Sequence, residues 1–513
     1  DKVDSDSLIL VFRSLSFKER VRLELVCKRW CAILRSTFAN VKALNVADFL
    51  VNSSQNYYQQ DSLSFVPTVI GLVSRCGPYV RSIGFGSRWL KVSQPIVDNI
   101  SHYCTRLSSL DLGCVILNAD ISEALTAIGP NLVDFSLEET SWIDQEAGDK
   151  VHRQFINMKK LVRINLRRAM FDLTRLPDLP ANLEYINISG ARGLSAATFN
   201  QFLMFHPNLT ELHVSPFPCG DATTLDIIGN MPKLRLLEIG YIQRFEEDSF
   251  DLHALSAISS LQTLHIQNCL PLTTSCFRLM CATLLNLTSL TVISCQRVLN
   301  YSPLGECQQL ERLNVGQTIQ FCDDDLTSIA ANRTLSSFTI TKCINVTTDG
   351  LVHLIRNCPI NERLYRYSQC TLSGCPAGWR GPLLWPVVAM RHWAMLVVNN
   401  CEDVSDAALV ALATSRLPVH TVAMQGCMYI SNKGAAALAN LEWLTALKEL
   451  DLSHNRAIDD QAVLAIYAAL RDAVARESST RTADEQKMTI YVHRTGVSPQ
   501  LEGVVRDLIT LSY

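Results

Sequence analysis

Cysteines recur at one position of an internal repeat, and thiols are the side chains here best suited to metal or redox chemistry. A cysteine stands eight residues after the first aliphatic or aromatic residue of the repeat at five places, and an asparagine takes that place in a sixth: Cys269, Cys295, Cys343, Cys401, Cys427 and Asn455. An aliphatic residue follows three positions later each time. A thiol that recurs with a packing repeat is best explained as a small buried residue in a turn. We therefore predict a structural role for these cysteines.

A second group of residues, Cys370, Cys375 and His392, contains side-chain types that bind zinc. The group supplies three ligands at loose spacing, whereas structural zinc sites have four ligands, usually in close pairs. We therefore expect no metal and no cofactor. The sequence also lacks a phosphate-binding glycine loop, a Gly-x-Ser-x-Gly elbow and a His-Glu-x-x-His motif. This pattern favours a protein without catalytic residues, not an enzyme.

Basic and aromatic side chains gather where strands are expected, on positions that alternate with buried aliphatics. The candidates for substrate binding are Arg163, Arg167, Arg168, Tyr185, His213 and Tyr241, preceded by Lys159 and Lys160 and followed by His265. Arginines near aromatic residues can bind an acidic or phosphorylated segment through bidentate contacts. The alternative, which we favour, is a solvated face on which the arginines pair with Asp134 or Glu138 of the preceding repeat.

A repeat of the form Leu-x-x-Leu-x-Leu, with other aliphatics substituting, positions all of these residues. It runs from Leu107-x-x-Leu110-x-Leu112 to Leu447-x-x-Leu450-x-Leu452, and its starts between Leu107 and Leu335 are 22–29 residues apart. Period-two alternation predicts a short strand, and no repeat can bury its aliphatic face alone, so neighbouring repeats must stack. The pattern resembles the leucine-rich repeat, and its cysteines resemble the cysteine-containing class of that repeat. The resemblance implies an α/β fold, a right-handed solenoid (horseshoe) with a parallel concave sheet and convex helices.

The first forty residues have a different pattern, which predicts two or three short helices. Leu8, Val11, Phe12 and Leu15 form the apolar stripe of one helix, and Ser16 to Glu19 reads as a capping box that opens a second. We expect that second helix to carry a continuous apolar face: Val21, Leu25, Val26, Trp30 and Ile33. So few helices cannot bury so many large side chains among themselves. The module therefore needs a partner surface.

The string Leu25-Val26-Cys27-Lys28-Arg29-Trp30 resembles the F-box motif, and Leu8-x-x-Val11-Phe12-x-x-Leu15 matches the preceding helix of that family. One departure is that Asp4 and Ser5 stand where the family usually has Leu-Pro, which we expect to weaken the first turn. The resemblance implies docking to a Skp-type adaptor and, through it, to a cullin–RING scaffold. It assigns the adaptor contacts to Leu8, Phe12, Leu15, Val26, Cys27 and Trp30.

These patterns predict an F-box over residues 1–40 and a solenoid over residues 41–513. Between Leu335 and Trp393 the repeat is interrupted, and residues 361–392 are either an insertion, which we favour, or a degenerate repeat. A flexible loop is expected over residues 471–487. A C-terminal cap over residues 488–513 is expected to contain a strand at 488–492 and a terminal helix at 500–511.

An F-box joined to leucine-rich repeats implies the non-catalytic substrate-recognition subunit of an SCF-type E3 ubiquitin ligase. The alternative is a scaffold or adaptor protein that acts without cullin-dependent ubiquitination. The net charge of -3 gives no general attraction to nucleic acid, and no apolar run is long enough to span a membrane. No signal peptide is visible at Asp1, and because the sequence does not begin with Met, we expect a piece of a longer protein. We expect a reducing compartment, the cytoplasm or the nucleus.

Overall fold

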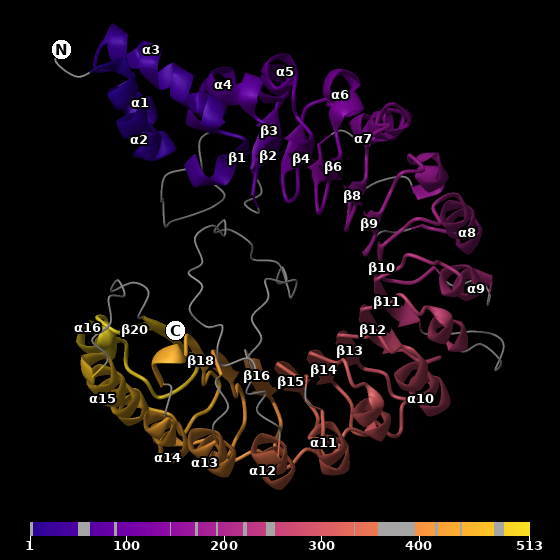
Figure 1. The fold of residues 1–513 in the computed structure, drawn as a ribbon, viewed down its shortest axis with the longest axis vertical. Helices are drawn as coiled ribbons and strands as arrows, with labels where there is room; N and C mark the ends of the chain where they lie inside the picture. Colours follow the sequence, from indigo (N-terminus) through magenta and orange to yellow (C-terminus); the bar gives the residue numbers. More distant parts are fainter. Residues whose placement is uncertain are drawn as a thin grey trace. The chain divides into compact units, whose positions relative to one another are not determined.

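The computed structural model describes residues 4–49, 62–86, 90–143, 145–169, 173–190, 193–218, 223–242, 252–332, 334–357, 395–415, 419–441, 444–476 and 487–513. These residues form two compact units, residues 4–218 (unit 1) and residues 223–513 (unit 2). Each unit has its own parallel strands, with helices along one face of them (Figure 1). The predicted α/β architecture, a helical module followed by a parallel-strand repeat array, is confirmed.

Three short helices open unit 1: α1 (Ser5–Ser14), α2 (Phe17–Leu23) and α3 (Lys28–Thr37). The predicted capping box begins α2, where the Glu19 carboxylate accepts a hydrogen bond from the Ser16 backbone N–H at 2.8 Å. The Asp4 side chain caps α1 by accepting the Ser7 backbone N–H, also at 2.8 Å. The residue that departs from the F-box pattern therefore supplies its own N-terminal cap.

The continuous second helix expected from the apolar spacing is wrong. Helix α2 ends at Leu23, and Leu25 and Val26 lie in the turn before α3, where they are exposed. The chain is extended at Cys27, whose Sγ accepts the Trp30 backbone N–H at 3.4 Å as the N-cap of α3. Apolar spacing alone does not distinguish such a turn from a helix.

Seven parallel strands form the main sheet of unit 1, each supplied by one repeat. They are β1 (Ala43–Asn45), β2 (Ser82–Gly84), β4 (Ser109–Asp111), β6 (Asp134–Ser136), β8 (Arg163–Asn165), β9 (Tyr185–Asn187) and β10 (Glu211–Val214). Neighbouring strands pair in register, so that Leu110, Phe135 and Ile164 lie side by side beneath the sheet and are buried. Strand β1 was missed by the sequence analysis.

A second, smaller parallel sheet in unit 1 was also not predicted. It contains β3 (Lys91–Ser93), β5 (Ile116–Asn118) and β7 (Ser141–Trp142). The α-helices of this unit are α4 (Ser62–Cys76), α5 (Gln94–Tyr103), α6 (Ser122–Ile128), α7 (Gln145–His152) and α8 (Ala196–Phe205). Its 3₁₀ helices are η1 (Phe38–Asn40), η2 (Val46–Phe49), η3 (Gly77–Tyr79), η4 (Gly129–Asn131), η5 (Phe155–Asn157) and η6 (Leu173–Asp178).

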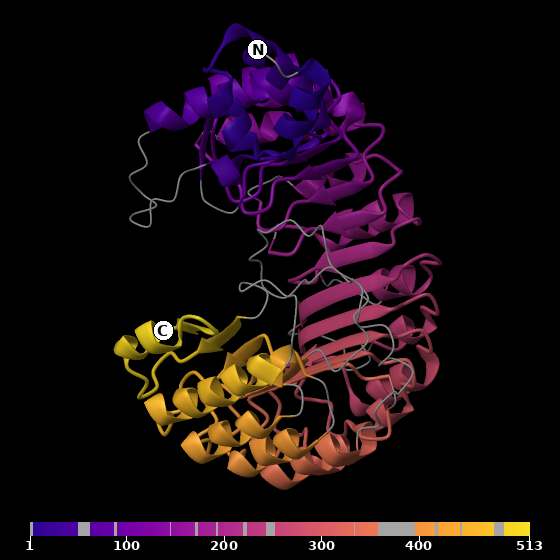
Figure 2. The same ribbon diagram turned by 60° about the vertical axis from the view of Figure 1, so that its left-hand side comes forward.

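In the described part of unit 2, ten parallel strands form the sheet. They are β11 (Leu236–Ile242), β12 (Thr263–Cys269), β13 (Ser289–Ile293), β14 (Arg312–Gly316), β15 (Ser337–Thr341), β16 (Met395–Asn399), β17 (Thr421–Ala423), β18 (Glu449–Asp451), β19 (Met488–Tyr491) and β20 (Ile509–Ser512). Its α-helices are α9 (Thr223–Gly229), α10 (Thr274–Thr283), α11 (Asp323–Ile329), α12 (Thr348–Asn357), α13 (Asp406–Thr414), α14 (Asn432–Ala437), α15 (Asp460–Arg476) and α16 (Glu502–Val505). Its 3₁₀ helices are η7 (His253–Ala257), η8 (Ser302–Glu306), η10 (Leu438–Asn440), η11 (Leu444–Ala446) and η12 (Pro499–Leu501). In Figure 2 the orange and yellow helices stack along one face of the strands.

A left-handed residue ends the strand segment in most repeats of both units. It stands seven residues after the first aliphatic of the repeat and directly before the position taken by the recurring cysteines. Lys342, with a φ of 55°, and Gly426, with a φ of 65°, are two examples. The chain therefore turns out of the sheet at the same point in successive repeats.

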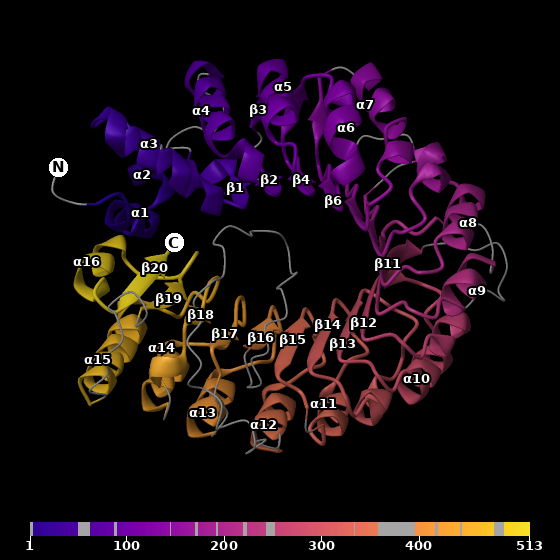
Figure 3. The same ribbon diagram turned by 45° about the horizontal axis from the view of Figure 1, so that its top comes forward.

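The interrupted repeat lies between β15 and β16. These two strands pair directly, with Phe338 opposite Leu396 and Ile340 opposite Val398 (Figure 3). No further strand fits between two directly paired strands, which favours the insertion over the degenerate repeat. Residues 361–392 themselves, with Cys370, Cys375 and His392, lie outside the described residues.

The C-terminal region differs from its prediction in two places. The helix expected over residues 500–511 is wrong beyond Val505, because α16 is short and β20 follows, paired with β19. The loop expected over residues 471–487 is wrong as far as Arg476, because α15 continues to that residue, and residues 477–486 lie outside the described residues. The strand expected from Met488 is confirmed as β19.

In the part of the chain that the structure describes, no helix has the length and apolar character needed to cross a membrane.

Candidate interaction surfaces

A small apolar core holds the three N-terminal helices together. Leu8 and Phe12 of α1 pack against Ile33 and Leu34 of α3, and all four are buried. The Trp30 ring meets the Phe12 ring edge-on, with 5.1 Å between ring centres. Of the residues predicted to contact the adaptor, Leu8 and Phe12 are therefore core residues of the unbound module, and Leu15 and Trp30 are partly buried against it.

The exposed apolar side chains of this module lie elsewhere, in two pairs. Leu25 and Val26 in the turn between α2 and α3 are 88% and 58% exposed, and Leu10 and Val11 on α1 are 68% and 54% exposed. Cys27 is exposed beside the first pair. Val26 and Cys27 were among the residues predicted to contact the adaptor, whereas Leu10, Val11 and Leu25, which are also exposed, were not. The signal was available, because Leu10 and Val11 cannot both face the core that Leu8 and Phe12 define on a helix.

One arginine ties the ends of two helices together. The guanidinium of Arg20 donates to the carbonyl oxygens of Arg13 at 3.0 Å and Leu15 at 2.9 Å, at the end of α1. It also donates to the carbonyl of Thr37 at 3.4 Å, at the end of α3. These carbonyls lack partners within their own helices. Arg20 of α2 thereby links the C-terminal ends of α1 and α3.

The module is joined firmly to the first repeat. The Glu24 carboxylate at the end of α2 pairs with the Arg75 guanidinium of α4 at 2.8 Å, and only 5% of the Glu24 side chain is exposed. At the start of α2, the centre of the Phe17 ring lies 5.1 Å from that of the Phe38 ring and 4.8 Å from that of the Phe49 ring. We call these contacts the F-box–repeat joint.

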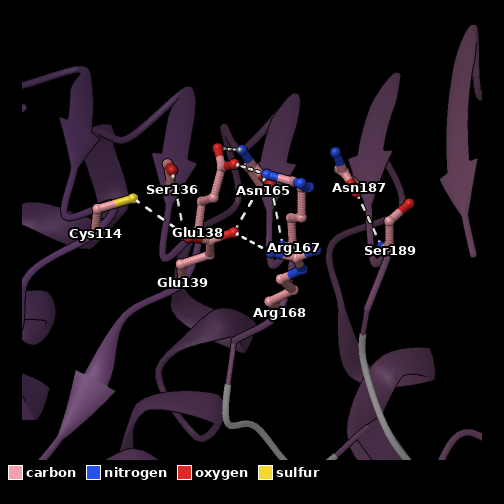
Figure 4. Close-up of polar contacts among 9 residues, drawn as sticks. All are labelled: Cys114, Ser136, Glu138, Glu139, Asn165, Arg167, Arg168, Asn187 and Ser189. Atoms are coloured by element: carbon pink, nitrogen blue, oxygen red, sulfur yellow. Dashed lines mark hydrogen bonds and ion pairs between the residues drawn. The ribbon is translucent and has the colours of Figure 1, made fainter. Parts of the chain in front are cut away.

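A network of charges lies where β6 and β8 end on the sheet of unit 1 (Figure 4). The Arg167 guanidinium lies 2.6 Å from the Glu138 carboxylate and 3.5 Å from that of Glu139. Arg168 pairs with Glu139 at 2.8 Å. The amide of Asn165 donates to Glu138 at 2.9 Å, and the Asn165 side-chain oxygen accepts the Arg167 backbone N–H. The predicted pairing with Glu138 is confirmed, and Glu139 is a second partner.

Arg163 belongs to a separate row across the same sheet. Its guanidinium carbon stands 4.0 Å above the centre of the Tyr185 ring, and its Nη1 lies 3.5 Å from the Glu211 carboxylate. The register places Asp134 opposite Arg163, but the ion pair that Arg163 makes is with Glu211. Among the described residues, each of the three arginines therefore already pairs with a carboxylate.

Burial changes the acid–base properties of this row. Desolvation raises the pKa of the Asp134 carboxyl, although the nearby Arg163 opposes the shift. Desolvation also raises the pKa of the Tyr185 phenol to about 12. Both groups are thus harder to ionise than in water, and the phenol is neutral at physiological pH.

The last two predicted substrate residues, His213 and Tyr241, belong to different units. His213 on β10 is buried, and its ring centre lies 5.3 Å from that of Tyr185. Tyr241 belongs to unit 2, where it is exposed and has a φ of 56°. The structure therefore brings Arg163, Tyr185 and His213 of unit 1 together.

The recurring cysteines are buried, as predicted. Cys343 and Cys427 have no exposed surface, and the Cys427 thiol donates to the carbonyl of Val398 in the preceding repeat at 3.2 Å. Desolvation raises the pKa of both thiols to about 12. Asn455, at the same position, donates to the carbonyls of Met424 and Leu452. Cys427 and Asn455 thus each connect their turn to the preceding repeat by a hydrogen bond.

Among the described residues no three His, Cys, Asp or Glu side chains come together as a metal site would require. The 14 described cysteines are free thiols.

Comparison with known proteins identifies an F-box domain at residues 2–38, within the module predicted over residues 1–40. A solved structure of an internalin (inlF) from Listeria monocytogenes str. 4b F2365 is similar to this chain with 16% sequence identity. That similarity covers 68% of this chain and 85% of the internalin, with a TM-score of 0.38. A structure of the Rad7 and Elc1 complex in yeast is similar with 15% identity over 69% of this chain and 82% of that chain, with a TM-score of 0.48. Neither similarity bears on function.

Proposed function

We propose that this chain is the substrate-recognition subunit of an SCF-type E3 ubiquitin ligase. Its F-box binds a Skp-type adaptor, and through it a cullin–RING scaffold, while its repeats bind a protein substrate for ubiquitination and proteasomal degradation. The chain is not an enzyme in this proposal, because it contributes proximity between substrate and ubiquitin-loaded enzyme. The observation that carries the proposal is an F-box domain whose α2–α3 turn exposes Leu25 and Val26.

Exposed apolar side chains on a small helical module favour a docked partner. Fully burying a leucine or valine side chain contributes about 1.5–3 kcal/mol. We assign direct adaptor contact to Leu25, Val26 and Cys27 of the turn and to Leu10 and Val11 of α1. Leu8, Phe12, Leu15 and Trp30 support these contacts by fixing α1 against α3.

For the substrate, the predicted contacts remain part of the proposal: Arg163, Arg167, Arg168, Tyr185, His213 and Tyr241. The ion pairs limit what the arginines can bind, because an acidic or phosphorylated segment would have to displace Glu138, Glu139 and Glu211. We further propose that the repeats belong to the cysteine-containing class. A chain with so many free thiols suits the cytoplasm or the nucleus.

Complex formation with a purified Skp-type adaptor tests the F-box assignment. We expect the wild-type chain to co-elute with the adaptor from a size-exclusion column, and a Leu25→Asp/Val26→Asp variant to elute alone. Leu285→Asp is the matched control, since Leu285 is 70% exposed in unit 2. Loss of binding in the control, or retention in the double variant, would contradict the assignment.

A reconstituted reaction separates the ligase from the alternative of a scaffold that acts without cullin. The chain, the adaptor, the cullin–RING scaffold and a ubiquitin-loaded enzyme are combined. A ligase subunit is expected to become ubiquitinated itself when no substrate is present, and the Leu25→Asp/Val26→Asp variant is not. Adaptor binding without cullin recruitment would favour the scaffold.

A further inference from the structure

A row of exposed side chains follows the buried turn residue in six successive repeats of unit 2, and that buried residue is a cysteine in five of them and Thr318 in the sixth. The row contains Leu270, Gln296, Ile319, Ile344, Glu402 and Met428, and we call it the turn edge. Each member comes directly after a buried residue at the repeated cysteine position, for example Ile344 after Cys343. The turn edge is distinct from the charged face of unit 1.

Strand pairing shows that these six residues are neighbours. Strands β12 to β16 pair one after another, with Ile266, Val292, Val315, Ile340 and Val398 in register. Strand β17 continues the series. Each turn-edge residue stands four positions after the residue of this buried row in its own repeat. Because adjacent strands are about 4.8 Å apart, equivalent side chains on the turns form a continuous row.

Four of the six positions carry large apolar side chains that face solvent. Leu270 is 39% exposed, Ile319 is 56%, Ile344 is 43% and Met428 is 78%. Tyr429, next to Met428, adds another at 64%. Scattered apolar residues are normal on a protein surface, but here Ile319 and Ile344 stand in adjacent repeats and Met428 with Tyr429 follows two repeats further on, so that exposed apolar side chains gather on one edge.

Two carboxylates interrupt the apolar row between Ile344 and Met428. Glu402 and its neighbour Asp403 are both exposed. The backbone carbonyl of Asp403 accepts the Thr348 hydroxyl at 2.7 Å, which holds this turn against the preceding repeat. The row therefore presents negative charge with apolar side chains on both sides.

We propose that the turn edge is the docking surface for a substrate segment in which a lysine or arginine is flanked on both sides by large apolar residues. The apolar side chains cover Ile319, Ile344 and Met428, and the basic group meets Glu402 and Asp403. Desolvation by the flanking apolar contacts strengthens that charge pairing relative to an exposed pair. This inference rests on the proposed function, because it names the class of substrate that the repeats select.

Selection from a random 16-residue peptide library, displayed on phage, tests the surface with the full chain as target. The selected sequences are expected to carry a basic residue between apolar residues. A synthetic, fluorescently labelled copy is then titrated by anisotropy against the wild type and single variants. We expect Ile344→Ser and Met428→Ser each to weaken binding at least tenfold. Leu285→Ser, at an exposed apolar site off the turn edge, is expected to change binding less than twofold.

Charge reversal gives the sharper control. The Glu402→Arg variant is expected to bind the basic peptide at least tenfold more weakly than the wild type. It is expected to bind a copy of the peptide with glutamate in place of the basic residue more tightly than the wild type does. Peptides that bind the wild type and the turn-edge variants equally, or a selection that yields no apolar–basic–apolar sequence, would overturn the proposal.

Two further measurements distinguish substrate docking from self-association and from loss of adaptor binding. Light scattering reports self-association, and a dimer dispersed by Ile344→Ser would assign the turn edge to a second copy and overturn the substrate proposal. Adaptor co-elution is measured on every variant. If the wild type does not bind the adaptor, the ligase proposal alone is contradicted. If it binds the adaptor but the peptide selection fails, only the proposal for the turn edge is contradicted.

Discussion

Asp406, the first residue of α13, accepts two hydrogen bonds from Ser431, the N-cap of α14 in the next repeat. The backbone N–H of Ser431 donates to one carboxylate oxygen at 2.7 Å, and its hydroxyl donates to the other at 2.6 Å. Asp323 and Thr347 repeat the arrangement at 2.9 Å and 2.6 Å. An acidic residue at the start of one helix thus satisfies the free donors at the start of the next, in addition to stabilising its own helix dipole.

Removing this carboxylate should loosen the contact between two repeats. We expect Asp406→Ala to lower the free energy of unfolding by about 1–3 kcal/mol, since it leaves the Ser431 donors without their acceptor. Asp406→Asn, which keeps one acceptor oxygen, should cost less. Asp403→Ala, in the same repeat but with no side-chain hydrogen bond to a neighbour, is the control. Urea unfolding measures all three, and equal stability of Asp406→Ala and the control would refute the role.

The left-handed turn position predicts opposite effects for two substitutions. Gly426→Ala should destabilise by about 1–2 kcal/mol, because φ is 65° there and an added Cβ would lie 2.5 Å from the Asn400 side-chain oxygen. Lys342→Gly should stabilise by about 0.5–1 kcal/mol, since glycine adopts a φ of 55° without strain. Lys342→Ala separates loss of the side chain from relief of strain. The midpoint of thermal unfolding should rise only for the glycine variant.

The buried turn thiols predict a defined dependence on pH. Burial raises the pKa of Cys343 and Cys427 from about 9 to about 12. Between those values the unfolded chain loses these protons and the folded chain keeps them. Their contribution to folding stability is therefore complete below pH 9 and falls as the pH rises toward 12. Denaturant unfolding at pH 8 and pH 10 should show a smaller loss for a Cys343→Ala/Cys427→Ala variant than for the wild type.

The same burial predicts selective alkylation. At pH 8, iodoacetamide should modify the exposed Cys27 and leave Cys343 and Cys427 unmodified until the chain is unfolded. Mass spectrometry of peptides from native and unfolded protein measures the difference. Rapid modification of Cys343 in the native protein would contradict its buried position.

The F-box–repeat joint predicts an asymmetric pair of substitutions. Arg75→Ala should destabilise unit 1 by about 1–3 kcal/mol, because it leaves the buried Glu24 carboxylate without its positive partner. Glu24→Gln should cost less, since it removes the charge together with the need for a partner. Circular dichroism during urea unfolding compares the two. A larger effect for Glu24→Gln would show that the carboxylate is not compensated by Arg75.

Most strands in the main sheet of unit 1 and in the sheet of unit 2 were predictable, because each repeat carries aliphatic residues at a fixed spacing where its strand lies. Leu110, Phe135 and Leu264 were placed in buried strands on that basis, and each is buried in the structure. The short strands of the second sheet in unit 1 gave no such signal. Two or three residues, as in β7 (Ser141–Trp142), are too few to show an alternation.

The misplaced helices have related causes. Leu25 and Val26 continue the helical spacing of α2, and the sequence therefore indicates a longer helix. In the structure the chain is extended at Cys27, so Leu25 and Val26 lie in a turn and face solvent. Ile509 and Leu511 alternate as a strand does, yet they follow the apolar residues of a four-residue helix and resemble its continuation. The pairing of Arg167 with Glu138 was predictable from neighbouring repeats, whereas that of Arg163 with Glu211 spans two strand spacings and depends on three-dimensional reach.

The F-box–repeat joint also bears on how a bound substrate would be presented to the ubiquitin-loaded enzyme. The Glu24–Arg75 ion pair and the contacts of the Phe17 ring with two further rings pack the helical module against the first repeats. A substrate bound to those repeats would then be held beside the helices that we propose dock the adaptor. The substrate lysines that can be ubiquitinated would depend on this geometry. Inserting a few residues between the helical module and the first repeat would therefore change which lysines are reached.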